Sequence, residues 1–306
     1  MAGAGTTTTT TNDASRRAGR RIPYLLIVPG LVFLLVFFIV PLITLFKISL
    51  SNKPDRLRPE YQFTWEWDNF SQAFTRFGEH LIRAFAYGAI ATILCALIAY
   101  PIAYFIAFKA GRYRNIMLGL VMMPFFTSFL LRTIAWQALL ADSGPVLRVV
   151  RALSFDGLLD TVAITENGAL LNTQTAVIGG LTYNFLPFML LPIYVSLEKI
   201  DIGLVDAAAD LYSSFSRTFR RVILPLSLPG VFAGTLLTFI PASGDFINAE
   251  LLGSPEAKRV VGNAVRTQFL NQNDYPAAAA ISFVLMAIIT ALVVVYAKFL
   301  GTEDLA

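Results

Sequence analysis

Long apolar stretches recur along this chain and are separated by shorter polar segments. In lipid the backbone polar groups must be satisfied within the protein, and a helix that rises about 1.5 Å per residue needs about 20 residues to cross the hydrocarbon core. Six stretches are that long and almost free of charge: residues 25–46, 84–108, 116–140, 176–197, 222–249 and 277–299. The pattern therefore predicts an all-α membrane protein with six transmembrane helices.

The polar segment ahead of the first apolar stretch has a different character. It contains a run of threonine at residues 6–11 and then four arginines within residues 16–21. Such a tract has no apolar surface to bury, so residues 1–21 are predicted to be a disordered basic tail and residues 22–306 a single transmembrane domain. The first apolar stretch is too long for the core of a signal peptide, and we expect it to be retained as a span.

The distribution of basic residues predicts the orientation of the spans. Basic residues near the first span and in short loops favour the cytoplasmic side. Four arginines precede the first span, and Lys109, Arg112 and Arg114 crowd the short turn between the second and third spans. Basic residues on the opposite side are similar in number but are accompanied by acidic residues. With six spans, both termini and the segment 198–224 are then expected in the cytoplasm.

Composition narrows the classes of function. Of the 306 residues, 56% are hydrophobic and 14% are charged, whereas soluble domains carry roughly 25% charged residues. Cys95 is the only cysteine and His80 the only histidine, so an intramolecular disulfide, a cysteine zinc site and a histidine metal cluster are excluded. We therefore assign no catalytic and no metal-binding residues, and a membrane-embedded enzyme is disfavoured. The chain lacks a basic stripe with interleaved aromatics, so no nucleic-acid partner is predicted.

The segment between the fourth and fifth spans has the most distinctive pattern. Residues 205–225 read VDAAADLYSSFSRTFRRVILP. This order predicts a helix of small residues, a break near Tyr212, and a second basic and aromatic helix that Ser213 or Ser214 caps. Pro225 is then expected in the first turn of the next helix. From the pattern alone, an amphipathic connector that lies on the membrane surface is an equally good interpretation.

This segment resembles the EAA loop of ABC importer permeases, a pattern of Glu-Ala-Ala, three residues, Gly, nine residues and Ile-x-Leu-Pro. Asp206, Ala207 and Ala208 match its start with Asp in place of Glu, and Val222, Leu224 and Pro225 match its end at the same spacing. In that family the loop docks into a groove on a cytoplasmic ATPase. The resemblance implies ATPase docking by nine residues of this chain: Asp206, Ala207, Ala208, Leu211, Tyr212, Arg217, Phe219, Arg220 and Pro225.

The chain departs from the family pattern at Tyr212, where the family has Gly. A left-handed backbone conformation costs a residue other than Gly about 1 kcal/mol or more. We therefore expect no tight left-handed turn at Tyr212, and expect Ser213 and Ser214 to reset the chain instead.

Three further stretches resemble the spermidine/putrescine-type branch of these permeases. They are residues 123–136 (MPFFTSFLLRTIAW), 241–253 (PASGDFINAELLG) and 268–276 (QFLNQNDYP). The resemblance implies the six-helix type I importer architecture in a bacterial inner membrane, and polyamine import by alternating access. It also implies four kinds of partner: a second homologous permease subunit, two ATPase subunits that bind ATP and Mg, an extracytoplasmic solute-binding protein and the lipid bilayer. The chain has no phosphate-loop motif, so we expect no cofactor on it and no enzymatic activity of its own.

Two alternative functions remain. Related permeases serve other small charged solutes, such as an amino-acid derivative, a thiamine-like cation or a phosphonate. An ion-coupled secondary transporter would need inverted repeats and a mid-membrane ion site. We find no convincing internal repeat, and apart from Lys298 at the end of the last span only Arg132 and Asp245 are charged within the spans.

Asp245 is the strongest candidate for contact with a cationic solute. An intramembrane carboxylate is costly and usually faces a polar cavity, and an aromatic ring nearby could add cation–π attraction. The alternative is a structural salt bridge to Arg132. The candidates for the solute path are Asp245, Trp136, Tyr183, Asn184, Phe246 and Asn248. Three further residues are assigned a structural or gating role: Arg132, Pro187 and Gly244.

Asn184 precedes Pro187 and Pro192 in the fourth apolar stretch, which predicts a bent fourth span. Asn184 is either an amide that lines the path at a hinge or the donor of an interhelical hydrogen bond, and the second interpretation is favoured.

Overall fold

The computed structural model describes residues 27–53, 61–152 and 169–299. These residues form helices joined by short loops, and they include no strand beyond isolated bridge residues such as the pair Ser51 and Phe63. The chain divides between Trp67 and Asp68 into two compact units, each of which is considered by itself. The predicted tail, residues 1–21, lies outside the described residues.

The first unit contains one long apolar helix. It is described from Ile27 to Ser49, and it ends as α2 (Val40–Ser49) after a π-helical segment, η1 (Leu35–Ile39). Pro41 stands in the first turn of α2 and has no N–H to donate, so the wider π-helical turn before it accommodates the missing donor. The helix matches the first predicted span and continues three residues beyond it.

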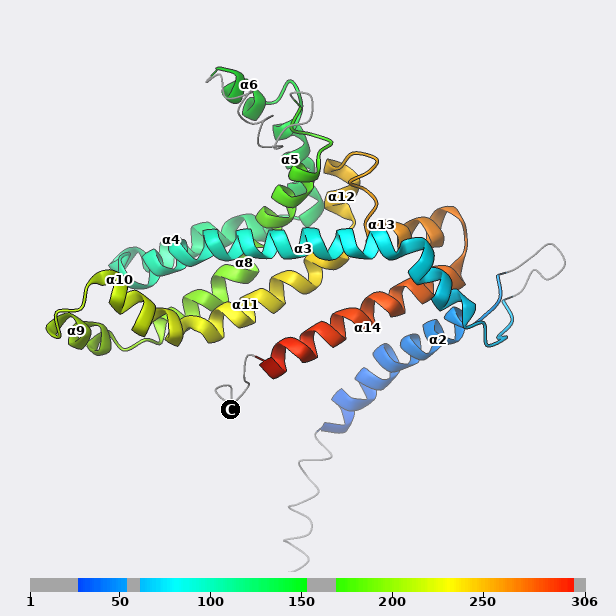
Figure 1. Cartoon of the computed structure of the whole chain (residues 1–306), viewed down its shortest axis with the longest axis horizontal. Coiled ribbons are helices and arrows are strands. Elements are labelled where there is room, and N and C mark those ends of the chain that lie inside the picture. Colours follow the sequence, from blue (N-terminus) through cyan, green and yellow to red (C-terminus); the bar gives the residue numbers. More distant parts are fainter. Residues whose placement is uncertain (1–26, 54–60, 153–168, 300–306) are drawn as a thin grey trace, which may run out of the picture. The chain divides into compact units, whose positions relative to one another are not determined.

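The second unit is built on three long helices that pack side by side: α3 (Asp68–Phe108), α8 (Gln174–Glu198) and α11 (Leu224–Gly244) (Figure 1). Small residues recur at helical spacing along the buried face of α3. They are Ala84, Gly88, Ala91, Cys95, Ala99 and Ala103. Small residues let helix backbones approach closely in membranes, where apolar side chains gain little by leaving lipid.

Glycines on α11 show how close the approach is. A Cβ on Gly230 would overlap the carbonyl oxygen of Pro192 on α8, and a Cβ on Gly234 would lie 2.8 Å from the sulfur of Met189. The helix α8 is continuous through both Pro187 and Pro192, and it is the predicted fourth span with two more residues at its start and one more at its end.

The second and sixth predicted spans are also found as helices. The helix α3 begins at Asp68, sixteen residues before the predicted start, and its 41 residues make it longer than a membrane requires. The helix α14 runs from Tyr275 to Phe299, close to the predicted bounds.

The third predicted span, 116–140, is not a single straight helix. The helical segments Gly111–Phe126 and Phe129–Val149 meet at an angle of 91°. The first comprises η2 (Gly111–Tyr113), α4 (Arg114–Met122) and η3 (Met123–Phe126). The second comprises α5 (Phe129–Leu140) and the part of α6 (Pro145–Ala152) up to Val149. Thr127 and Ser128 separate them with extended ψ angles of 154° and 136°, because the Thr127 hydroxyl bonds the Pro124 carbonyl and the chain leaves the helix there.

The fifth predicted span, 222–249, has different limits in the structure. One continuous helix runs from Phe215 to Gly244 and comprises α10 (Phe215–Thr218), the π-helical segment η4 (Phe219–Ile223) and α11. It stops before Asp245, and a separate short helix, α12 (Ile247–Leu252), follows. The break falls at Asp245 because its carboxylate accepts hydrogen bonds from the start of α12. The described residues thus hold five helices that could cross a membrane, or six if the bent pair is one span.

Candidate functional site

The predicted docking segment is the segment 198–224 between the fourth and fifth predicted spans. It forms a short helix, a left-handed turn and the beginning of the long helix that follows. The short helix is α9 (Ile202–Asp210). Asp206 and Ala207 on it are exposed, and Ala208 is half-buried. The predicted helix, break and second helix are all present, so the pattern placed these elements in the right order.

The expectation for Tyr212 is wrong. Its φ is +54°, so the chain does make a left-handed turn at a residue with a side chain. The Ser213 N–H donates to the Ala208 carbonyl at 3.1 Å, which is the closing bond of a Schellman motif with Tyr212 at the position that usually holds Gly. This bond offsets the conformational cost. Tyr212 is 96% exposed.

The serines also act differently from the prediction. Ser214 occupies the N-cap position of α10 with extended backbone, but its side chain makes no capping hydrogen bond. Its carbonyl accepts instead from the N–H groups of Arg217 and Thr218 at 2.9 and 3.0 Å. Pro225 stands in the first turn of α11, as predicted, although η4 joins α10 to α11 without a break.

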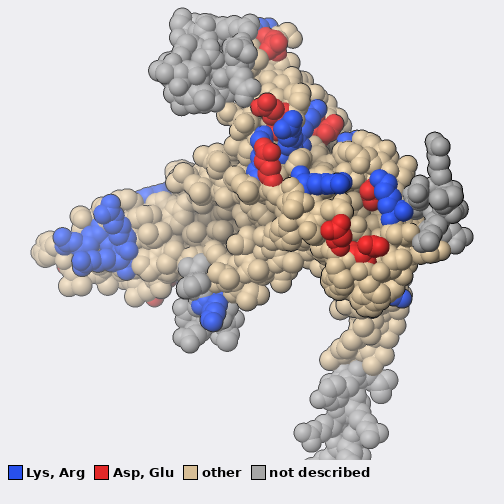
Figure 2. Space-filling view, turned by 45° about the vertical axis from the view of Figure 1, so that its right-hand side comes forward, with Lys and Arg blue, Asp and Glu red and all other residues tan. Residues whose placement is uncertain are grey.

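The other docking candidates divide into exposed and packed residues. Leu211 is 82% exposed, and Arg217, Arg220 and Pro225 are exposed as well. Phe219 is half-buried, and its ring lies 5.7 Å from that of Tyr100 on α3. Figure 2 shows Lys and Arg side chains gathered at one end of the second unit, where Figure 1 places α9 and α10. The structure therefore presents a basic surface with exposed apolar side chains, while Phe219 holds that surface to α3.

A second group of predicted residues forms a buried polar network at the other end of α11. The Asp245 carboxylate accepts from the N–H and the amide Nδ2 of Asn248 at 2.9 and 2.8 Å. The Asn184 amide donates to Asn248 Oδ1 at 3.0 Å and to the Thr133 hydroxyl at 3.2 Å. Asn184, Asn248 and Thr133 are fully buried. The network ties α5, α8 and α12 together, and Asn184 makes the interhelical hydrogen bonds that the favoured interpretation expects.

Arg132 does not pair with Asp245, so the salt bridge considered from the sequence is not formed. Its guanidinium carbon lies 5.2 Å from the ring centre of Phe125 and 5.7 Å from that of Phe129, within the range of cation–π attraction. Arg132 is only 9% exposed, so its guanidinium is buried against these two rings rather than paired with the Asp245 carboxylate.

The aromatic candidates for the solute path are only partly brought together. Trp136 and Tyr183 touch edge to face with ring centres 5.4 Å apart. Phe246 directly follows Asp245 and is 36% exposed. Pro187 is buried within α8. Gly244 has open space where a Cβ would stand, so its own position does not require a glycine.

Sequence reasoning missed three residues that shape this region. Thr133 stands next to Arg132 and completes the network. A Cβ on Gly180 would lie 2.7 Å from Asn248 Oδ1, and a Cβ on Gly262 of α13 (Val261–Arg266) would lie 2.7 Å from the Gly244 carbonyl oxygen. Each of these three residues lies on a different helix from the residue that it contacts. No local signal in the sequence links residues on two different helices.

The fold defines a multi-pass helical membrane protein, with the segment predicted to dock an ATPase lying between its fourth and fifth predicted spans. Residues 99–301 match the family described as binding-protein-dependent transport system inner membrane component. The chain therefore belongs to this family, and the resemblance identified from the docking segment is confirmed.

Curated relatives and solved structures agree with this assignment. The chain is 34% identical over 265 residues to the spermidine/putrescine transport system permease protein PotB of Haemophilus influenzae, which covers 86% of this chain and 89% of that protein. It is equally similar to PotB of Escherichia coli strain K12, of which it covers 92%. Its fold resembles a chain of a bacterial ABC transporter involved in import of the acidic polysaccharide alginate, with a TM-score of 0.65, 16% identity and coverage of 94% and 98% of the two chains.

Proposed function

We propose that this chain is the transmembrane permease subunit of an ATP-driven importer of polyamines in a bacterial inner membrane. The observation that carries the proposal is the 34% identity over 86% of the chain to spermidine/putrescine permeases. That similarity extends over most of the chain, so it is not confined to one motif. The fold likeness to the alginate transporter supports the architecture alone and says nothing about the solute.

The proposed assembly has four protein components besides this chain. A second homologous permease subunit completes the path, two cytoplasmic ATPase subunits bind ATP and Mg, and an extracytoplasmic binding protein delivers the solute to a complex embedded in the bilayer. We propose six spans, with the bent pair of Gly111–Phe126 and Phe129–Val149 as the third. Both termini are then cytoplasmic. Membership of a family named for dependence on a binding protein supports this arrangement.

The continuous helix Phe215–Gly244 supports a mechanism for coupling. It has 30 residues and is about 45 Å long. One end carries the docking segment, and the other end is followed directly by Asp245 and the polar network. Closure of the ATPase subunits would move α9, and this rigid helix would carry the displacement to α12 at the opposite end of the path. No chemical step takes place on this chain.

Asp245 is the proposed contact for a solute ammonium group. Its carboxylate is held in place by Asn248, and Arg132 does not neutralise it. The other carboxylate nearby, Glu250, already lies 3.7 Å from Arg266 and 3.9 Å from Lys258. A cationic solute that enters this end of the path therefore meets, at Asp245, a carboxylate that forms no ion pair with any described residue. This favours polyamines over anionic solutes such as phosphonates.

The proposal is tested by uptake in cells that lack their own polyamine uptake and express this chain with its partner subunits. Labelled spermidine should accumulate, and unlabelled putrescine and spermidine should compete, whereas an amino acid, thiamine or a sugar should not. Competition by thiamine or an amino acid instead would assign the chain to one of the alternative solutes.

A further inference from the structure

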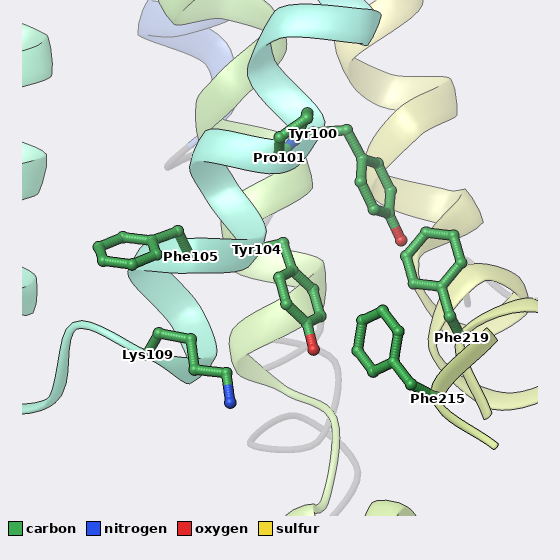
Figure 3. Close-up of a pocket in the computed structure, with 7 residues that line it drawn as sticks. All are labelled: Tyr100, Pro101, Tyr104, Phe105, Lys109, Phe215 and Phe219. Atoms are coloured by element: carbon green, nitrogen blue, oxygen red, sulfur yellow. The ribbon is translucent and has the colours of Figure 1, made fainter. Parts of the chain in front are cut away.

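A pocket of about 340 Å³ lies where the end of α3 meets α10 and η4 (Figure 3). One wall consists of Tyr100, Tyr104 and neighbouring residues of α3, and the other consists of Phe215 and Phe219. The Tyr104 ring centre is 6.2 Å from that of Phe215 and 6.3 Å from that of Phe219. Phe215 is 67% exposed. The pocket is thus an open aromatic trough.

Two polar groups stand at one end of this trough. The Tyr104 hydroxyl and the Lys109 ammonium lie at the same end in Figure 3. No residue in the described part of the chain forms a hydrogen bond with that hydroxyl or an ion pair with that ammonium, whereas nearby Arg114 pairs with Glu198 at 2.7 Å. The Tyr100 hydroxyl is already bonded to Ser227 Oγ at 2.7 Å. A donor and a positive charge therefore remain available for a ligand.

The surroundings of the pocket are basic. Residues 109–114 and 198–221, which flank it, contain seven basic and four acidic residues, and Figure 2 shows the blue cluster at this end. The pocket is formed by the last turns of α3 and the first turns of the helix Phe215–Gly244. Aromatic and basic side chains at helix ends are typical of the boundary between membrane and water.

We propose that this pocket binds an anionic phospholipid of the cytoplasmic leaflet, with an acyl chain against the aromatic rings and the phosphate beside Lys109 and Tyr104. Basic pockets between helices on this side of a membrane favour anionic headgroups. The aromatic rings alone could also attract a cation, but Lys109 inside the pocket and Arg217 and Arg220 beside it oppose a positive ligand.

The lipid would have a mechanical consequence, which rests on the proposed function. The pocket joins α3 to α10 and η4, the segment through which ATPase motion is proposed to reach the path. A lipid that fills the trough increases the contact between these two walls. Coupled uptake is therefore expected to require an anionic lipid even when the complex is fully assembled.

The test uses the complete complex in vesicles of phosphatidylcholine with and without phosphatidylglycerol. Native mass spectrometry measures the phosphatidylglycerol that the complex retains, and ATP-driven uptake is measured in the same vesicles. Lys109→Gln should lower retention about fivefold, the effect of one basic side chain near an anionic membrane. Arg112→Gln is the matched control, because Arg112 lies on the same turn but stacks on Tyr113 at 4.7 Å and does not line the pocket. Its retention should equal that of the wild type.

Equal retention by the wild type and Lys109→Gln would overturn the proposal. Equal losses in the Lys109 and Arg112 variants would also overturn it, because they would indicate a general surface attraction. Retention of phosphatidylcholine in place of phosphatidylglycerol would likewise exclude it. Retention is measured without transport, so a failure of polyamine uptake in every vesicle would contradict the proposed function and leave the lipid result standing.

Discussion

Gly262 of α13 packs directly on the carbonyl oxygen of Gly244 at the end of α11. A Cβ at Gly262 would lie 2.7 Å from that oxygen and 3.0 Å from Cβ of Phe246, while a Cβ at Gly244 would meet nothing within 4 Å. The glycine that the packing requires is therefore the one that sequence reasoning did not select. This contact adjoins the turn at Asp245, where the fifth helix gives way to α12.

This difference between the two glycines predicts that replacement by Ala changes the free energy of unfolding differently at the two positions. Gly262→Ala must displace backbone, and we expect it to destabilise the protein by about 1–3 kcal/mol. Gly244→Ala is the matched control, since it adds the same methyl group in open space. It should be neutral or should stabilise the helix by up to about 1 kcal/mol. Denaturant unfolding of the purified protein in detergent measures both, and equal effects would contradict the close contact.

Replacement of Asp245 by Asn separates its charge from its hydrogen bonds. The Asn carbonyl oxygen can still accept from the N–H and amide of Asn248, so stability should be retained. The loss of the negative charge should raise the KM for spermidine about tenfold, since hydrogen bonds to charged groups contribute more than neutral ones. Asp142→Asn, which removes an exposed carboxylate elsewhere, is the control. An unchanged KM in Asp245→Asn would assign Asp245 to a purely structural role.

Ala207→Trp tests the docking face of α9. Ala207 is exposed, so the larger side chain should not disturb the fold of the permease. It should block close approach of the ATPase, and uptake should fall to near background while the complex components remain folded. Ala207→Ser is the small control and should transport normally. Coupled uptake at the wild-type rate in the Trp variant would exclude this face from docking.

Tyr212 offers a test that distinguishes conformation from contact. Tyr212→Gly removes a side chain from a left-handed residue, so the isolated permease should be as stable as the wild type or more stable by up to about 1 kcal/mol. Its affinity for the ATPase should nevertheless fall, because the exposed ring is lost. Tyr212→Phe keeps the ring and should bind normally, and Tyr212→Asn should behave like the Gly variant. Wild-type affinity in both Gly and Asn variants would show that the ring makes no contact.

Long uniform patterns were the most predictable feature of the fold. The helices α8 and α14 begin and end within two residues of the predicted limits, because apolar residues continue to helix ends that polar residues mark. The breaks within apolar sequence were not predicted. One helix ends where the Thr127 hydroxyl donates to the Pro124 carbonyl, and another ends where the Asp245 carboxylate accepts from Asn248. Neither hydrogen bond changes the average hydropathy of the stretch in which it lies.

The two sites differ in how far the sequence could predict them. The docking segment is continuous in sequence, so its order of elements was predictable. The expectation for Tyr212 was wrong because the bond from Ser213 to Ala208 was not considered, and the predicted serine cap was wrong because the Ser214 side chain makes no capping hydrogen bond. The polar network is assembled from three helices. Asn184 and Asn248 were chosen singly, but their hydrogen bond and the contribution of Thr133 depend on packing that no local pattern encodes.

The most direct test of the central claim is ATP-driven uptake of labelled spermidine by vesicles that contain this chain, its permease partner and the ATPase subunits, with the binding protein supplied outside. We expect accumulation that requires ATP and the binding protein and that fails in Asp206→Lys at the docking segment. Accumulation without ATP, or an ion gradient that replaces ATP as the driving force, would contradict the account.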